Sequence, residues 1–165
     1  MELRVISIKE AKRNINTLNL SNVKAIIISS YNDDIEIIPS KNKLLIEFDD
    51  LNYQSQNSFN RNLAKKIKEF IGKIDLSKNK LYVCCDSGES RSSAVAACIL
   101  RKYGEDENVI WKDTSYHPNI LVYRILCEEL GIKNSKIILK YKTYINNKAL
   151  QNKIKSAKKM RLPKK

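Results

Sequence analysis

Histidine is almost absent from this sequence of 165 residues, since His117 is the only one. The four cysteines, at positions 84, 85, 98 and 127, show neither the paired spacing of zinc ligands nor the density of a secreted disulfide scaffold. The sequence therefore predicts neither a structural zinc site nor a disulfide framework. Reduced thiols in a cytoplasmic protein are the simplest interpretation.

Long apolar stretches are missing as well. No run approaches the roughly 18 consecutive apolar residues of a membrane span. The beginning, MELRVISIKEAKR, carries acidic Glu2 and lacks the apolar centre and small-residue cleavage site of a secretion signal. We therefore expect a cytoplasmic protein without a transmembrane segment, and a chain of this length with 42% hydrophobic residues suits one compact domain.

Acidic residues are absent from the C-terminal fifth of the chain. Residues 133–165 contain twelve Lys or Arg and no Asp or Glu, whereas residues 1–132 contain 19 basic and 18 acidic residues. We divide the chain accordingly into a nearly neutral body, 1–132, and a basic extension, 133–165, expected to be a helix or strand with a partly disordered tail. The extension either meets an anionic partner, such as nucleic acid or a lipid surface, or is only a solvated arm.

Apolar runs rich in Ile, Leu and Val predict strands, and runs with helical spacing predict helices. The expected strands are 3–8, 23–29, 34–39, 44–48 and 80–85. The expected helices are an amphipathic one at 58–74 with Ser58 as its cap, a buried one at 92–104, and one at 118–131 with Pro118 in its first turn. Segment 135–145 is ambiguous between strand and helix. The alternation predicts an α/β fold, a central and mostly parallel sheet of about four to five strands with helices on both faces.

The most informative stretch is VCCDSGESRSS, residues 83–93, which joins the last predicted strand to the buried helix. Such a loop directs several backbone N–H groups and a helix N-terminus toward one spot, which favours an anion. Gly88 allows the loop to curl, and the planar guanidinium of Arg91 can hold two phosphate oxygens at once. The same surroundings stabilise a thiolate, so we interpret Cys85 as a nucleophile rather than as a small buried residue only.

These residues resemble a known family. The stretch CDSGESRS (85–92) is similar to the Cys-x-x-Gly-x-x-Arg-Ser/Thr signature of the cysteine-dependent protein tyrosine and dual-specificity phosphatases. FDDLN (48–52), the helix 58–72, the loop, the buried helix and YHPNILVYRIL (116–126) follow in the order of a compact dual-specificity phosphatase, over residues 20–131. The resemblance implies that fold, with residues 1–132 as the catalytic domain and 133–165 outside it.

The resemblance also implies roles for individual residues. Cys85 would attack phosphorus and form a phosphocysteine, Ser92 would donate a hydrogen bond to the sulfur, and Asp50, with Asp49 as the alternative, would protonate the leaving group. The equatorial oxygens would be held by the phosphate-binding loop, which consists of Asp86, Ser87, Gly88, Glu89, Ser90 and Arg91. This mechanism requires no metal and no organic cofactor. Tyr116 and Asn119 would border the pocket.

The chain departs from the family pattern at position 84, where Cys84 stands in place of the usual histidine. Strand alternation turns Cys84 away from Cys85, so we expect it to pack in the core, as we also expect for Cys98 and Cys127. The departure keeps open an inactive phosphate-recognising module, and a sulfurtransferase-like or arsenate reductase-like protein is the third alternative. Carboxylates at Asp86 and Glu89 disfavour a polyphosphorylated head group by repulsion, so a phosphorylated protein is the expected substrate.

Overall fold

The computed structural model describes residues 1–14, 19–31 and 40–160, and the side chains of 1–14, 19–31 and 40–155. The elements that position the site are four strands and six helices. The strands are β1 (Glu2–Ser7), β2 (Val23–Ser29), β3 (Lys43–Glu47) and β4 (Lys80–Cys85). The helices are α1 (Ile8–Arg13), α3 (Arg61–Gly72), α4 (Arg91–Lys102), α5 (Asn108–Trp111), α6 (Ile120–Glu129) and α7 (Lys136–Met160).

The four strands form one sheet in the order β1-β4-β2-β3, and each of the three pairings is parallel. β4, which leads to the candidate phosphate loop, therefore lies inside the sheet between β1 and β2. Its side chains are buried on both faces from Leu81 onward, as is typical of a parallel strand covered on both sides. The expected α/β fold with a largely parallel sheet is confirmed, while the expected strand 34–39 lies outside the described residues.

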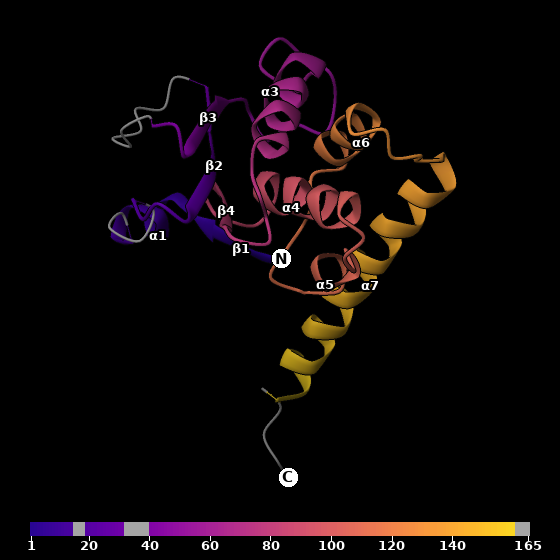
Figure 1. The fold of residues 1–165 in the computed structure, drawn as a ribbon. Coiled ribbons are helices and arrows are strands. Elements are labelled where there is room, and N and C mark those ends of the chain that lie inside the picture. Colours follow the sequence, from indigo (N-terminus) through magenta and orange to yellow (C-terminus); the bar gives the residue numbers. More distant parts are fainter. Residues whose placement is uncertain (15–18, 32–39, 161–165) are drawn as a thin grey trace.

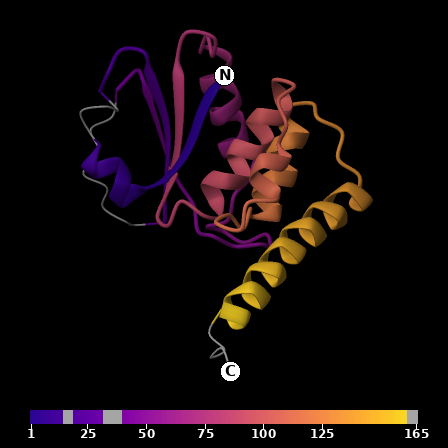
Figure 2. The same cartoon turned by 90° about the horizontal axis from the view of Figure 1, so that it is seen from below.

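The two faces of the sheet are covered unequally. Figures 1 and 2 show α1 on one face and α3, α4, α5 and α6 on the other. Because successive side chains of a strand point to opposite faces, Cys85 belongs to the large core under α4, whereas Cys84 belongs to the smaller core under α1. The expectation that Cys84 packs in the core is confirmed.

Two helix starts differ from the expected ones. The side chain of Asn60 caps α3 by accepting hydrogen bonds from the backbone of Asn62 and Leu63. Ser58 is not the cap, because its hydroxyl bonds instead to both backbone groups of Ser55 at 2.9 Å. Pro118 likewise precedes α6 rather than lying in its first turn, since Asn119 is the residue that caps this helix.

The segment that the sequence left open between strand and helix lies in α7, which crosses the outer side of α5 and α6 (Figures 1 and 2). Buried polar contacts hold it there. The ammonium of Lys142 lies 3.1 Å from the carboxylate of Glu107 and donates to Asn108 at 2.8 Å. The amide of Asn146 donates to the carbonyl oxygen of Tyr116 at 2.8 Å. None of the helices in the described part of the chain is long and apolar enough to cross a membrane.

Candidate active site

The candidate nucleophile lies where β4 ends. Cys85 is the last residue of β4 and is 1% exposed, and α4 begins six residues later at Arg91. The Sγ atom of Cys85 lies 3.0 Å from the hydroxyl of Ser92, which is fully buried in the first turn of α4. The turn that follows the strand is closed by a hydrogen bond of 3.2 Å from the N–H of Gly88 to the carbonyl oxygen of Cys85. The sulfur therefore faces the start of α4.

Gly88 is required by the shape of this loop. Its φ is +75°, a backbone conformation that residues with a side chain rarely adopt. A Cβ atom here would lie 2.7 Å from the backbone carbon of Ile6 and 2.7 Å from the backbone nitrogen of Ser7. The loop therefore packs directly against the junction between β1 and α1, which no other residue type would permit without a backbone shift.

Only 4% of the Arg91 side chain is exposed, and hydrogen bonds and an ion pair hold its guanidinium in place. One terminal nitrogen donates to the carbonyl oxygen of Phe48 at 2.8 Å and to the hydroxyl of Ser30 at 3.2 Å. The other forms an ion pair with Asp86. The buried Nε atom has no hydrogen-bond partner among the described residues. A buried donor without a partner is costly, so this nitrogen marks a place where an acceptor fits.

Asp86 connects the loop to the end of β2. Its carboxylate accepts a hydrogen bond of 2.9 Å from the hydroxyl of Ser30 in addition to its ion pair with Arg91. The Asp86 side chain is 43% exposed, so water screens this pair and the carboxylate can turn outward at little cost. Sequence reasoning missed Ser30, because a serine after a strand carries no signal of its own and reaches Arg91 only in the folded chain.

The structure brings Asp50 to the loop. One oxygen of the Asp50 carboxylate accepts a hydrogen bond of 2.9 Å from the hydroxyl of Ser90 and another of 2.7 Å from the side-chain amide of Asn119. Asp49 points elsewhere, since its carboxylate accepts a hydrogen bond of 3.0 Å from the backbone N–H of Tyr31. Of the two neighbouring aspartates, the carboxylate of Asp50 is therefore the one bonded to the loop.

The segment before α6 braces the loop from outside. The N–H groups of His117 and Asn119 donate to the carbonyl oxygens of Glu89 and Ser90 at 3.0 and 3.2 Å. The buried side chain of Asn119 also donates to the carbonyl oxygen of Leu51 at 3.0 Å. Asn119 thus joins the loop, the Asp50 segment and α6. From the sequence, Asn119 was expected only to border the pocket. The signal for its larger role was its position directly after His117 and Pro118, where an asparagine can cap the following helix.

The other cysteines are buried, and within the described part of the chain none of them bonds to Arg91, Ser92 or Asp50. Burial, the neighbouring Cys85 and the charge of Glu10 raise the pKa of Cys84 to about 12, so Cys84 remains a thiol. Cys98 and Cys127 are fully buried, with their sulfur atoms 2.8 Å apart between α4 and α6. The pKa of Cys98 is well above its ordinary value because of burial. Within the described ranges, no cluster of three His, Cys, Asp or Glu side chains is placed to hold a metal ion.

Comparison with solved structures agrees with this arrangement of elements. The chain is similar to the human tyrosine phosphatase-like serine/threonine/tyrosine-interacting protein, with a TM-score of 0.55 and 20% identity over 76% of this chain and 89% of that chain. It is equally similar to the PTP-2 phosphatase of Cydia pomonella, with a TM-score of 0.55 and 16% identity over 76% of this chain and 84% of that chain. The fold is that of the tyrosine phosphatases. The resemblance that the sequence predicted is therefore confirmed at the level of the fold.

The phosphatase fold does not by itself decide the activity. One of the two structures is named a phosphatase and the other a phosphatase-like interacting protein. No protein-family model matches the chain, and no curated protein matches its sequence. The activity must therefore be argued from the residues of the site.

Proposed function

We propose that this protein is a cysteine-dependent phosphatase that hydrolyses phosphate monoesters through a phosphocysteine intermediate, with a phosphorylated protein as substrate and the cytoplasm as its location. The observation that carries the proposal is the guanidinium of Arg91, which is buried beside the loop and fixed by Phe48 and Ser30, with its Nε donor unpartnered among the described residues. A phosphoryl oxygen is the acceptor that fits such a donor. The Cys85–Ser92 pair lies at the same helix N-terminus, which favours negative charge.

In the first step, the sulfur of Cys85 attacks phosphorus, an S–P bond forms, and the bond from phosphorus to the ester oxygen breaks. The fixed loop N–H groups and Arg91 stabilise the charge on the transferring phosphoryl group. Asp50 gives its proton to the departing oxygen, because its carboxylate is held against the loop by Ser90 and Asn119.

In the second step, water attacks phosphorus and Asp50 takes its proton. The S–P bond breaks and the electron pair returns to sulfur, where the hydroxyl of Ser92, 3.0 Å away, donates a hydrogen bond to the departing thiolate. Inorganic phosphate is released. No step requires a metal or an organic cofactor.

The direct test is hydrolysis of p-nitrophenyl phosphate. We expect turnover by the wild type, inhibition by vanadate and loss of turnover to background in Cys85→Ser, since a serine hydroxyl is a far weaker nucleophile than a thiolate. Cys98→Ser, which alters a buried cysteine between α4 and α6, is the matched control. Undiminished turnover in Cys85→Ser would contradict the proposed mechanism.

One contact favours a second candidate, a module that recognises phosphate without turning it over. The Asp86 carboxylate is paired with the guanidinium that the phosphate must reach, and Cys84 replaces the usual histidine. Micromolar binding of a phosphopeptide with no turnover by the wild type would select this candidate. A persulfide on Cys85 after thiosulfate treatment would select the sulfurtransferase-like alternative instead.

The basic extension is proposed to meet an anionic partner through the outer face of α7. Lys136, Lys140 and Lys148 are exposed there, and residues 133–165 contain no acidic residue. Leu139 and Ile145 of α7 pack against the core of the domain, so deleting α7 would uncover that core, and substitution is the better test. Changing the three lysines to glutamine should weaken retention on a polyanion and reduce its salt dependence. An unchanged salt series would exclude this partner.

A further inference from the structure

Three exposed apolar side chains form a stripe along the outer side of α7. Ile137, Tyr141 and Tyr144 are 78%, 59% and 58% exposed, and their spacing of i, i+4 and i+7 places them next to one another on one face of the helix. The other side of α7 carries the contacts to the domain, such as those of Lys142 and Asn146. Single exposed apolar residues are common on proteins, but a group of neighbouring ones indicates contact with another molecule. We call these three residues the α7 stripe.

Exposed lysines border the α7 stripe. Lys136, Lys140 and Lys148 lie next to it along the helix, and none of the three forms an ion pair with a described residue. The ammonium of Lys148 lies 5.9 Å from the ring centre of Tyr144. Because residues 133–165 contain no Asp or Glu, the outer face of α7 combines apolar surface with positive charge of one sign only.

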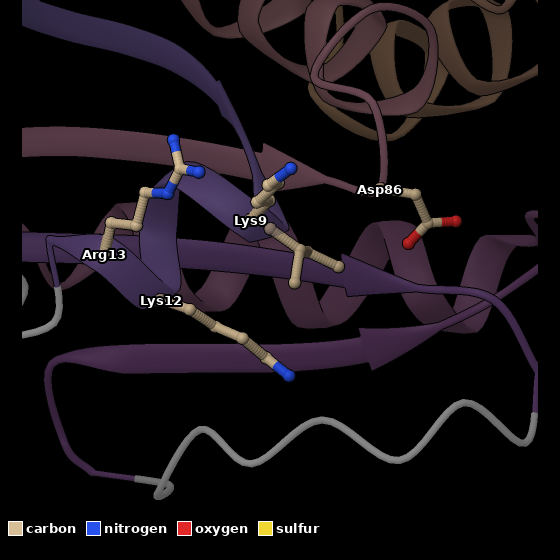
Figure 3. Close-up of a pocket in the computed structure, with 5 residues that line it drawn as sticks. Lys9, Lys12, Arg13 and Asp86 are labelled. Carbon is tan, nitrogen blue, oxygen red and sulfur yellow. The ribbon is translucent and has the colours of Figure 1, made fainter.

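Basic residues also gather on α1, but in different surroundings. Lys9, Lys12 and Arg13 line a hollow of about 500 Å³ together with Asp86 (Figure 3). That hollow includes a carboxylate, and none of the large exposed hydrophobic residues of the described chain lies on α1. Positive charge and exposed apolar surface therefore occur together on α7 and not on α1.

A membrane surface with anionic lipids fits both properties of this face. Each lysine near such a surface strengthens binding by about fivefold. Tyrosine rings are enriched at the boundary between head groups and hydrocarbon, and an aliphatic side chain such as Ile137 is stabilised just below it. A nucleic acid can bind the lysines and stack on Tyr141 and Tyr144, but it offers no comparable contact to an isoleucine.

We propose that α7 docks this protein onto a membrane surface that contains anionic lipids, with the α7 stripe among the head groups and Lys136, Lys140 and Lys148 beside the lipid phosphates. This inference rests on the anionic partner proposed for α7 and identifies it as lipid, and it does not depend on the proposed catalysis. The helix lies along the surface, and its inner side stays packed on the domain.

Docking in this way leaves the candidate active site open. Near the other end of α7, Leu150, Lys153 and Ile154 line a hollow together with Glu89 of the phosphate loop and His117. None of these residues belongs to the α7 stripe, so the docked face does not cover the loop. A phosphorylated protein therefore still reaches the loop of the docked molecule.

The test is flotation of the whole chain with vesicles of phosphatidylcholine and phosphatidylserine, compared with vesicles of phosphatidylcholine alone. We expect binding to the anionic vesicles that weakens as salt is raised. Lys136→Gln/Lys140→Gln/Lys148→Gln should lower the partition coefficient about 10²-fold, and Ile137→Ser/Tyr141→Ser/Tyr144→Ser about tenfold. Equal binding to both kinds of vesicle, or binding that survives either variant, would overturn the inference.

Two control variants assign the binding to α7. Lys136→Arg/Lys140→Arg/Lys148→Arg conserves the charge and should retain vesicle binding. Lys65→Gln/Lys66→Gln/Lys73→Gln removes the same charge from the exposed side of α3 and its C-cap, and should also retain it. Equal losses in the glutamine variants of α3 and α7 would show that only the net charge of the protein matters, which would contradict a docking face on α7.

Ile137 separates lipid from nucleic acid. Ile137→Ser should weaken binding to anionic vesicles and leave binding to oligouridylate unchanged. In Ile137→Trp, tryptophan fluorescence should shift to shorter wavelength on anionic vesicles, whereas Lys65→Trp on α3 should show no shift, with the buried Trp111 as a constant background in both. An unshifted spectrum of Ile137→Trp would contradict insertion of the α7 stripe.

The remaining outcomes separate the proposals from one another. Lysine-dependent binding of oligouridylate without binding to anionic vesicles would overturn the lipid assignment, while the anionic partner of α7 stands. Binding of neither would overturn both. Cys85→Ser should bind vesicles as the wild type does, so vesicle binding by a wild type that hydrolyses no phosphate ester would contradict the proposed catalysis only.

Discussion

The loop between β4 and α4 and the segment around Asp50 meet at the same site by different routes. The loop is local in its backbone, because Cys85, Arg91 and Ser92 lie within eight residues of each other between one strand end and one helix start. The side chain of Arg91 adds hydrogen bonds to the distant residues Phe48 and Ser30. Asp50 is brought in by contacts over long distances in the sequence, 40 residues to Ser90 and 69 to Asn119. A local arrangement depends on backbone geometry, whereas the remote one depends on a few side-chain hydrogen bonds and is therefore easier to weaken by single substitutions.

Arg91→Lys tests the local region with the largest expected effect. A lysine retains the charge but loses the planar fork that can bind phosphate while also bonding to Phe48 and Ser30. We expect kcat/KM for p-nitrophenyl phosphate to fall about 10³-fold. Retention of more than a tenth of the wild-type kcat/KM would show that the guanidinium is not central to the site.

Asp50→Asn tests the remote segment and separates it from its neighbour. Asparagine keeps the size of the side chain but cannot supply the proton, so kcat for a phosphopeptide should fall about 10²-fold, with a smaller loss for an aryl phosphate whose leaving group needs little protonation. The matched control is Asp49→Asn, since the Asp49 carboxylate bonds to the backbone of Tyr31 rather than to the loop. A larger loss in Asp49→Asn would reverse the assignment.

Asn119→Ala tests the brace between the two regions. It removes the hydrogen bonds to Asp50 and Leu51 and the cap of α6. We expect kcat/KM to fall about tenfold, and the free energy of unfolding in urea to fall by about 1 kcal/mol from the lost cap. Asn60→Ala, which removes the cap of α3, should lower stability similarly with little effect on turnover, and equal losses of turnover in both variants would argue against a positioning role.

Cys84→Ala should have the smallest effect on turnover, less than about threefold, because its side chain packs under α1 on the other face of the sheet. The variant should instead change how the free energy of unfolding depends on pH. Folding raises the pKa of Cys84 from 9.0 to about 12, so this contribution to the free energy of unfolding is complete below pH 9 and is lost as pH rises toward 12. The variant should make that decline less steep by up to about 1.4 kcal/mol per pH unit, measured by urea titration.

Features set by contacts between residues close together in the sequence could be predicted, whereas features set by contacts between distant residues could not. The loop from Cys85 to Ser92 could be predicted, because an apolar strand, a glycine and a buried helix follow one another directly in the sequence. Its residues also resemble the phosphatase signature. Helix caps were less predictable, because Ser58 and Asn60 are both good caps and only the course of the chain through Ser55 decides between them. Segment 135–145 has no decisive periodicity, and its burial against α5 and α6 distinguishes the helix from the strand.

The amino-acid sequence by itself determined the parallel α/β architecture and the strand–loop–helix around Cys85, because hydrophobic periodicity and short-range turn chemistry act between neighbouring residues. Only the tertiary structure decided that Asp50 rather than Asp49 is bonded to the loop, that Ser30 and Asn119 support it, and that the cations of α1 lie beside Asp86. Those contacts join residues far apart in the chain, and their partners are set by how the elements pack rather than by any pattern along the sequence.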